Sequence, residues 1–320
     1  MTGPRVLDGR EPDAIASAVD ILESGGVVGM PTETVYGLAA ATHDPEAIAR
    51  IYRLKGRPTS NPLIAHVLDS DGGRSLVRPG SWTNEAERLA ELFWPGPLTL
   101  VLPRSDQVNP IATGGRDSIA VRAPGHPVAR ALLEAFGAAV SAPSANRSGA
   151  VSPTTAEHVA ADYADTPLCI LDGGPAEVGL ESTVLDLRGG NPRILRPGHI
   201  TAADLQPVLG AVEDSSVLVQ GDSPGTSPRH YAPRTPVELV EHFDEARQDD
   251  AVIRFLQSAP AGMRLDCPLG GDAGIAGQGL FDAMRRCDLS GASRILIEQP
   301  PAGPEWHAIT DRLRRACIRS

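Results

Sequence analysis

The chain has few cysteines and no long apolar run, and both absences narrow its class. Its four cysteines (Cys169, Cys267, Cys287 and Cys317) form no CxxC pair. This pattern argues against a disulfide framework or a zinc site and favours four small core residues. No segment approaches the ~20 apolar residues of a membrane span, and the charged N-terminus lacks the apolar stretch of a signal peptide. We therefore expect a reduced, soluble, cytoplasmic protein.

The chain also lacks an excess of basic residues and several familiar catalytic motifs. Its 29 Lys and Arg residues against 40 Asp and Glu residues give a formal net charge of −11. That balance disfavours a broad nucleic-acid-binding face but permits a local positive pocket. The motifs GxxxxGK(S/T), HExxH, GxSxG and DxDxDG do not occur, which excludes the P-loop, zinc-protease, α/β-hydrolase and EF-hand classes. No side chain is marked as a covalent nucleophile.

Short apolar runs alternate with helical periods through the first two thirds of the chain. Runs ending in small or turn-forming residues are typical of strands, and they occupy 27–30, 62–69, 98–103, 118–124, 138–144 and 168–174. Helical spacing occurs between several of them, for example over 13–24 and 44–56. This alternation predicts an α/β domain with a largely buried sheet.

The character of the sequence changes after Gly210. We expect a catalytic domain over 1–210, a proline-rich linker or lid over 211–236, and a small α/β domain over 237–320. In this last part we predict a helix near 250–257. The glycine-rich stretch 270–279 lacks the spacing of a dinucleotide-binding fingerprint and is predicted to be a mobile loop.

The loops at the expected strand ends are rich in hydroxyl, amide and isolated cationic side chains. They contribute Thr32, Thr34, Tyr36, Lys55, Arg57, Asn61, Arg122, Ser141, Ser144 and Asn146. Because ligands of open α/β sheets bind outside the strand ends, these loops predict one shared site. Each feature alone also has a structural explanation: Ser/Asn/Pro clusters form turns, Arg122 fits a surface ion pair, and His66 fits a core histidine.

The cations suggest what such a site would bind. Lys55 and Arg57 lie two residues apart at a helix end with hydroxyl and amide donors nearby, which suits a polyphosphate. Arg122 at a strand end suits a planar carboxylate, because a guanidinium offers two parallel donors. The residues therefore predict a nucleotide and a carboxylic acid as ligands.

Seven ordered motifs closely resemble the threonylcarbamoyl-AMP synthases of the YrdC-like family. They are "MPTETVYGLAA", "KGRPTSNPL", "WPGPLTLVL", "AVRAPGHP", "SAPSANRSGAVSPT", "GLESTVLDL" and "ILRPG". The segment "SPGTSPRHYAP" and the small domain after it are similar to the family's long form. The resemblance is dense over Pro31 to Gly198 and patchy in the C-terminal domain. It implies a YrdC-like twisted mixed sheet with flanking helices and a small Rossmann-like C-terminal domain.

The resemblance also implies a reaction. L-threonine, bicarbonate and ATP would give L-threonylcarbamoyl adenylate and pyrophosphate, with Mg2+ accompanying the ATP. The product would serve N6-threonylcarbamoyladenosine at position 37 of tRNAs that read codons starting with A, through a partner transferase complex. Direct binding of tRNA would be weak or absent. Lys55, Arg57 and the magnesium ion would offset the developing pyrophosphate charge, so these two residues are the expected catalytic groups.

Where this chain matches the family's motifs, the resemblance also indicates which of its residues occupy the family's binding sites. The resemblance places Thr34, His66, Arg122, Ala142 (through its backbone) and Ser182 at a threonine site. It places Lys55, Arg57, Asn61, Ser118, Ser144, Ser152 and Arg196 at an ATP site, and Asn146 belongs to the same loop as Ser144. Some long-form members have a nucleotide-contacting aromatic residue where this chain has Pro228. We expect His230 or Tyr231 to take over that contact.

Two other functions remain open on the residues alone. YrdC-like domains can present a positive concave surface, so an RNA-binding module is one alternative, which the acidic composition disfavours. A carbamoyl-transfer enzyme of the hydrogenase-maturation type shares this domain, but this chain lacks the accompanying acylphosphatase and zinc-finger segments. In the C-terminal domain, Asp311 stands where an asparagine is common in the family.

Overall fold

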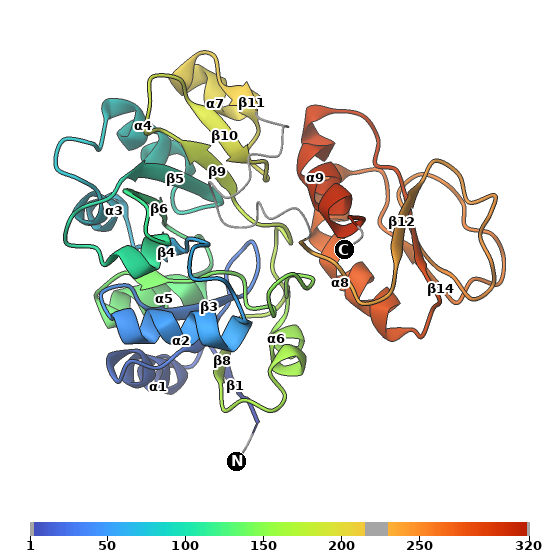
Figure 1. Cartoon of the computed structure of the whole chain (residues 1–320), viewed down its shortest axis with the longest axis horizontal. Helices are drawn as coiled ribbons and strands as arrows, with labels where there is room; N and C mark the ends of the chain where they lie inside the picture. Colours follow the sequence, from blue (N-terminus) through green and yellow to red (C-terminus); the bar gives the residue numbers. More distant parts are fainter. Residues whose placement is uncertain (1–2, 215–229, 319–320) are drawn as a thin grey trace.

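The structure, a computed structural model, describes residues 3–214 and 230–318. Within these residues the first sheet has eleven strands in the order β1-β8-β2-β3-β7-β4-β6-β5-β9-β10-β11 (Figure 1). The strands are β1 (Arg5–Asp8), β2 (Val28–Met30), β3 (Gly37–Ala41), β4 (Ile64–His66), β5 (Leu98–Pro103), β6 (Ser118–Arg122), β7 (Val140–Ser141), β8 (Cys169–Asp172), β9 (Thr183–Asp186), β10 (Arg193–Arg196) and β11 (Glu213–Asp214). Parallel and antiparallel pairs are mixed, so the predicted twisted mixed sheet is confirmed.

Helices cover both faces of this sheet. They are α1 (Pro12–Glu23), α2 (Pro45–Lys55), α3 (Ser70–Leu76), α4 (Asn84–Phe93), α5 (Pro127–Phe136), α6 (Ala156–Asp162) and α7 (Ala202–Leu209), with a 3-10 turn at Pro110–Thr113. Successive side chains of a strand point to opposite faces. Ala39 of β3 accordingly packs with α1 and α5, whereas Leu38 and Ala40 pack with α2, α4, α6 and α7. Apart from the edge strand β1, which is mostly exposed, the sheet is largely buried, as the sequence predicts.

The ends of α2 follow from its sequence. The side chain of Asp44 accepts hydrogen bonds from the backbone N–H groups of Glu46 and Ala47, and Pro45 occupies the first turn. Gly56 ends the helix in the left-handed conformation at φ 62°, which glycine adopts without steric cost. The end of the helix at Gly56 therefore fixes the positions of Lys55, its last residue, and of Arg57, which follows it.

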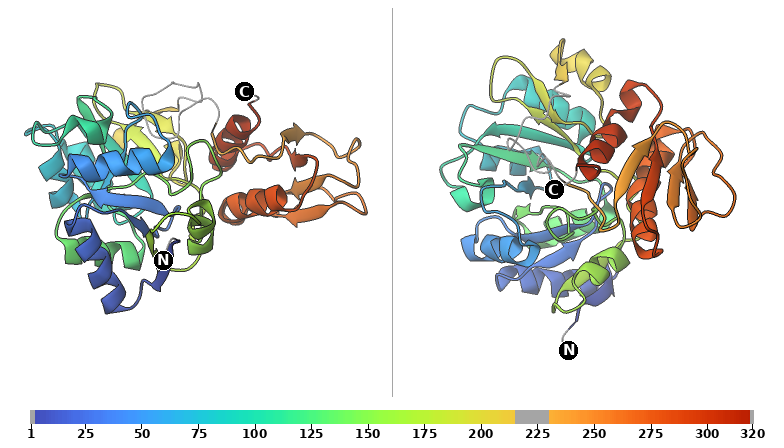
Figure 2. Two further views of the ribbon diagram at one scale, coloured as in Figure 1. Left: turned by 60° about the horizontal axis from the view of Figure 1, so that its bottom comes forward. Right: turned by 45° about the vertical axis from the view of Figure 1, so that its right-hand side comes forward.

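The second sheet has four parallel strands in the order β12-β15-β13-β14 within the described residues. Its elements are β12 (Val237–Val240), β13 (Ala251–Arg254), β14 (Leu265–Pro268), α8 (Ala273–Leu289), β15 (Ile295–Glu298), a 3-10 turn at Pro304–Trp306, and α9 (His307–Ala316). We call the part of the chain that contains the eleven-stranded sheet the first unit, and the part that contains the four-stranded sheet the C-terminal unit. Figures 1 and 2 show α8 and α9 on the side of the four-stranded sheet that faces the first unit. The expected small α/β fold is confirmed.

Two predictions for this part are wrong. The helix expected near 250–257 is strand β13, because the buried Ala251, Val252 and Ile253 pair with β14 and β15. Most of the glycine-rich stretch 270–279, expected as a mobile loop, belongs to α8, which begins at Ala273. Asp272 caps this helix by accepting from the Ile275 N–H, and buried Gly277 packs against the first unit, where a Cβ would lie 3.2 Å from Leu180 Cδ1.

The two units share a hydrophobic interface. The apolar core around α8 and α9 includes Val35, Val151 and Leu180 from the first unit, and Arg285 of α8 forms an ion pair with Asp162 of α6 at 2.7 Å. The same core holds the thiols of Cys267 and Cys287, 3.8 Å apart. Residues 215–229, including Pro228 and most of the predicted lid, lie outside the described residues.

No helix within residues 3–214 and 230–318 is both long enough and apolar enough to cross a membrane.

Candidate active site

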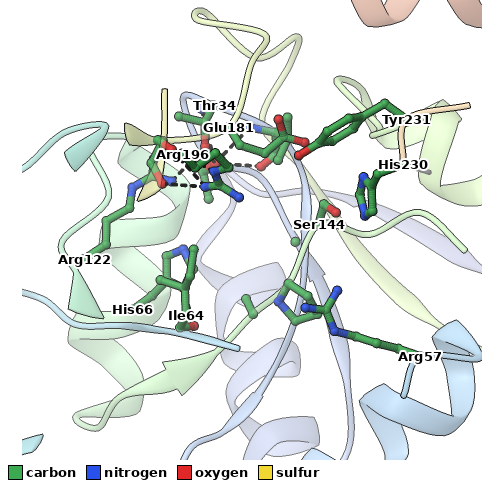
Figure 3. Close-up of a pocket in the computed structure, with 16 residues that line it drawn as sticks. Thr34, Arg57, Ile64, His66, Arg122, Ser144, Glu181, Arg196, His230 and Tyr231 are labelled. Carbon is green, nitrogen blue, oxygen red and sulfur yellow. Dashed lines mark hydrogen bonds between the residues drawn. The ribbon is translucent and has the colours of Figure 1, made fainter. Parts of the chain in front are cut away.

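A pocket lies where the loops of the first sheet meet His230 and Tyr231 (Figure 3). It is lined by Thr32, Thr34, Val35, Gly37, Arg57, Ile64, His66, Arg122, Ala142, Pro143, Ser144, Glu181, Ser182, Arg196, His230 and Tyr231. Arg122 and His66 lie on one side, while Arg57, His230 and Tyr231 lie on the other. The predicted convergence of loops on one site is therefore found.

Arg122 is the last residue of β6, and it pairs in register with His66 at the end of the parallel strand β4. Its Nε donates to the carbonyl of Gly96 at 3.1 Å and its Nη1 to Thr34 Oγ1 at 2.8 Å. Its Nη2 lies 2.7 Å from Glu33 Oε1 in a buried ion pair. A guanidinium has five N–H donors, and Arg122 Nη2 has no hydrogen-bond partner among the described residues, so N–H groups on both terminal nitrogens are left for a carboxylate ligand.

The sequence patterns did not single out Glu33. Burial would raise the pKa of its carboxyl group, but the Arg122 charge and hydrogen bond hold it below its usual value. Glu33 is therefore ionised and fixes the orientation of the Arg122 guanidinium. Its position inside "PTETVYG" could have pointed to it. The threonines and the tyrosine of that stretch drew attention instead, because they are hydroxyl donors.

His66 is buried and uncharged. Burial, reinforced by the nearby Arg122 charge, lowers its pKa to about 3. Its Nδ1 lies 3.1 Å from the carbonyl oxygen of Ile64, and a neutral ring must donate its proton to such an acceptor. The other ring nitrogen is then a hydrogen-bond acceptor. This state suits contact with a hydroxyl or ammonium group of a ligand.

Arg57 lines the opposite side of the pocket. Its Nε and Nη2 donate to the carbonyls of Asn61 and Pro62 at 3.2 and 2.9 Å. Burial lowers the pKa of the guanidinium to about 10, so Arg57 stays charged at neutral pH. The predicted residue Asn61 takes part here through its backbone carbonyl, and its side chain does not line the pocket.

Lys55 lies behind the pocket wall. Its Nζ donates to the carbonyl of Ser144 at 2.5 Å and to that of Asn146. Burial, with the Arg57 charge adding to it, shifts its pKa well below the usual value. These contacts tie the end of α2 to the loop that carries Ser144, so in this structure Lys55 shapes the wall.

Ser182 and Arg196 form a third side of the pocket. Arg196 Nε and Nη2 donate to the carbonyl of Ser182 at 3.1 and 2.9 Å, and Nη2 also reaches Ser182 Oγ at 3.1 Å. The same Oγ lies 2.7 Å from Thr99 Oγ1 on β5. Ser182 thus links the start of β9 to the cation at the end of β10.

Three other predicted residues do not line the pocket, although two of them, Asn146 and Ser152, bond to residues that do. Asn146 accepts from Ser144 Oγ at 2.5 Å and holds its own loop through the carbonyls of Arg147 and Ala150. Ser152 donates to Glu181 Oε1 at 2.6 Å. Ser118 lies away from the pocket, 3.4 Å from Arg188 Nη1.

Glu181 is the second residue that sequence reasoning missed. It stands before Ser182 in "GLESTVLDL", and a carboxylate is not expected beside an anion-binding site. In the structure it lines the pocket, buried. Burial would raise the pKa of its carboxyl group, but Arg312, Arg196 and Ser152 together hold it below its usual value. Glu181 is therefore a fixed negative charge among cations.

His230 and Tyr231 close the pocket from the C-terminal side. Burial raises the pKa of Tyr231 to about 12, so its hydroxyl is protonated. Burial, then the charges of Arg57 and Lys55, lower the pKa of His230 well below its usual value. His230 Nδ1 and the Tyr231 hydroxyl have no hydrogen-bond partner among the described residues. Two buried polar atoms of this kind are suited to a ligand.

Three arginines and several neutral hydrogen-bond donors line this pocket at the strand ends of an α/β sheet, an arrangement suited to small anionic ligands. A family model described as "Telomere recombination" matches residues 20–198, and one described as "Threonylcarbamoyl-AMP synthase, C-terminal domain" matches residues 200–317. The chain belongs to the family of threonylcarbamoyl-AMP synthases, in the form with two domains.

Individual proteins agree with this membership. The chain is 39% identical to the threonylcarbamoyl-AMP synthase of Pyrococcus abyssi over 94% of this chain and 93% of the relative. It is 37% identical to that of Bacillus subtilis over 94% and 92%. The crystal structure of P. abyssi Sua5 complexed with L-threonine superposes with a TM-score of 0.87 at 36% identity, covering 98% of this chain and 96% of the other.

Proposed function

We propose that this protein is a threonylcarbamoyl-AMP synthase, which forms L-threonylcarbamoyl adenylate and pyrophosphate from L-threonine, bicarbonate and ATP. The names of its full-length relatives support this activity. The observation that carries it in the structure is the pocket itself. Arg122, which we propose binds a carboxylate, lies across one cavity from Arg57, which we propose binds phosphate (Figure 3).

Threonine would occupy the Arg122 side. The unused N–H groups of Arg122 receive its carboxylate, and a bidentate pair of this kind fixes orientation as well as affinity. Thr34, His66 and Ser182 supply hydroxyl and imidazole partners for its polar groups, and Ala142 lines the same wall through its backbone. This neutral imidazole can accept from the substrate but carries no charge of its own.

ATP would occupy the Arg57 side. Arg57 and Arg196 face the phosphates, Ser144 contributes its hydroxyl, and the unpartnered atoms of His230 and Tyr231 provide further contacts. Lys55 would act through the loop it holds, or would meet a phosphate after exchanging its carbonyl partners. Charge held in a buried pocket stabilises developing pyrophosphate more strongly than it would in water.

The chemistry needs positioning more than a nucleophilic side chain. Bicarbonate takes up a proton and loses water to give CO2. The neutral amine of threonine adds to this CO2 and releases one N–H proton, which leaves a carbamate anion. A carbamate oxygen then attacks the α-phosphorus of ATP, and the bond to pyrophosphate breaks. Two substrates bound in one pocket would have their reacting atoms close together, and exclusion of water from the pocket would limit hydrolysis of the labile product.

Magnesium is proposed to enter with the nucleotide. No cluster of three His, Cys, Asp or Glu side chains suited to a metal occurs in residues 3–214 and 230–318, and both oxygens of the pocket carboxylate Glu181 already have partners. Mg2+ commonly relies on substrate phosphates and water for most of its ligands. Bound to ATP, it would neutralise phosphate charge beside Arg57.

The product implies a second reaction. A carbamoyl adenylate is an activated, mixed anhydride-like donor, so a partner transferase complex must consume it before water does. We propose that this complex uses it to form N6-threonylcarbamoyladenosine at position 37 of tRNAs that read codons starting with A.

Pyrophosphate release tests the function directly. The purified protein, incubated with Mg-ATP, bicarbonate and L-threonine, should release pyrophosphate only when all three substrates are present. Omission of each substrate in turn provides the controls. Release without threonine would refute the assignment, and so would its absence from the complete mixture.

A further inference from the structure

An arginine of the C-terminal unit, Arg312, bonds to a residue of the pocket wall. Arg312 lies in α9 and is fully buried. Its Nε donates to Glu181 Oε2 at 2.9 Å, and its Nη1 donates to the carbonyl of Pro197 and to Asp311 Oδ2, each at 2.9 Å. Both Glu181 and Pro197 belong to the first unit. Arg312 therefore crosses the interface with directional bonds.

Glu181 connects this arginine to the pocket. One carboxylate oxygen accepts from Arg312, and the other accepts from Ser152 Oγ at 2.6 Å. With both oxygens engaged, the side chain has one orientation beside Ser182 and Arg196. A buried ion pair contributes little net stability compared with apolar packing. This pair is better explained by the geometry it imposes on the pocket.

Tyr231 is held by the same arginine. The Arg312 guanidinium lies 5.3 Å from the centre of the Tyr231 ring, and Phe281 of α8 stacks on that ring at 5.5 Å. The backbone of Tyr231 has φ 60°, a conformation that costs a non-glycine residue energy and persists only where its surroundings enforce it. The backbone N–H of Ala232 donates to the carbonyl of Gly149 at 3.0 Å, which anchors this segment to the first unit.

We propose that Arg312 is a positioning residue of the active site, through which the C-terminal domain orients Glu181 and Tyr231 for the reaction. This inference rests on the proposed function. The arrangement needs a planar guanidinium: Nε binds a carboxylate, Nη1 binds a carbonyl, and the same group lies near an aromatic ring. A lysine ammonium has one nitrogen and cannot make these contacts together. The C-terminal domain is thus part of the catalytic apparatus.

Arg312→Gln and Arg312→Lys test the role, with Arg314→Ala as the matched control. Arg314 carries the same charge on the exposed side of α9. We expect both Arg312 variants to lose at least tenfold in kcat/KM, and the control to stay within about twofold of wild type. The Lys variant keeps the charge, so it remains informative if the Gln variant does not fold. Wild-type rates in either folded Arg312 variant would overturn the proposal.

A double-mutant cycle separates positioning from general destabilisation. If Arg312 acts through Glu181, then Glu181→Gln combined with Arg312→Gln should lose no more activity than the more damaging single change. A double variant whose losses multiply would show independent roles and refute the coupling. Melting temperatures of all variants control for stability.

Hydrogen exchange gives a readout that does not depend on turnover. In the Arg312 variants, the amide hydrogens of residues 230–232 should exchange at least tenfold faster than in wild type and in Arg314→Ala. Unchanged exchange there would refute the positioning of Tyr231. A wild-type protein that releases no pyrophosphate while the variants still show faster exchange would refute the proposed function alone.

Discussion

Arg122 shows how one residue is prepared for a ligand before the ligand arrives. Its Nε and Nη1 donate to Gly96 and Thr34, and its Nη2 forms an ion pair with Glu33. The guanidinium is therefore held in a single plane at the end of β6. Binding of a ligand carboxylate would cost little side-chain entropy at Arg122, because this side chain is already ordered in the folded protein.

Arg122→Lys should weaken threonine binding far more than ATP binding. Charge-assisted hydrogen bonds are worth about 1.5–3 kcal/mol each, so the loss of the two-pronged contact predicts a rise in the KM for threonine of about tenfold or more. The KM for ATP should change less than about threefold. Steady-state pyrophosphate assays with each substrate varied in turn measure both. Equal damage to the two KM values would contradict the carboxylate role.

His66 predicts a pH dependence of stability. In the unfolded chain this imidazole takes up a proton near its ordinary pKa of 6.5, whereas burial lowers its folded pKa to about 3. The unfolded state therefore binds more protons between these values. Stability is fully present above pH 6.5 and is lost as pH falls toward 3, by up to about 1.4 kcal/mol per pH unit for this group.

Replacement of the histidine isolates its contribution. Between pH 6.5 and 5, the free energy of unfolding of His66→Gln should fall less steeply than that of wild type. Urea denaturation across this range measures both slopes. Because the pKa of His230 is shifted in the same direction, some slope should remain in the variant. Identical slopes in the two proteins would contradict the prediction.

At the scale of elements, the two units approach each other closely at Gly179. Its φ is 74°, and a Cβ there would lie 2.7 Å from the carbonyl oxygen of Gly277 in α8. No other residue could occupy this position without moving the helix. The loop that carries Gly179 continues into Glu181, so the docking of α8 and the shape of the pocket depend on the same few residues.

Gly179→Ala should disturb this docking, and Gly137→Ala is its control. Gly137 ends α5 with a similar φ of 68°, but open space surrounds its missing Cβ. The control should therefore cost only the strain of the left-handed conformation, about 1–2 kcal/mol. We expect the Gly179 variant to lose more stability and to lose pyrophosphate formation at temperatures where the control is active. Equal effects in chemical denaturation and in the assay would refute the steric argument.

The sequence predicted elements well where the pattern was local. Asp44 and Gly56 mark the ends of α2, and the structure has them there. Prediction from the sequence was wrong where tertiary contacts override the local helix propensity. Glycines disfavour helices in isolation, yet Gly277 is what lets α8 approach Leu180. The pairing of Arg312 with Glu181 joins residues 131 apart in the chain, and no local signal reports such a contact.

At the scale of the whole molecule, the protein is acidic but its pocket is not. The formal net charge is −11, while Arg57, Arg122 and Arg196 line one cavity. Buried cations of this kind attract small anions that fit inside. They offer little to a polyanion that must stay outside, because an acidic surface repels it.

Bare tRNA should therefore bind weakly. We expect a dissociation constant weaker than about 1 μM at physiological salt, in the range of non-specific association. Filter binding at two salt concentrations, with a known tRNA-binding protein as the positive control, measures it. Tight binding with steep salt dependence would revive an RNA-binding role.

The buried Arg312 also limits which C-terminal units can replace the present one in a chimaeric protein. Two folded units are usually exchangeable when their interface only covers apolar surface. Here the carboxylate, the tyrosine and the arginine come from three different stretches of the chain, and they are complementary only as a set. A chimaera that joins this catalytic unit to a relative's C-terminal unit would inherit a working pocket only if the incoming helix also presents an arginine at the position of Arg312.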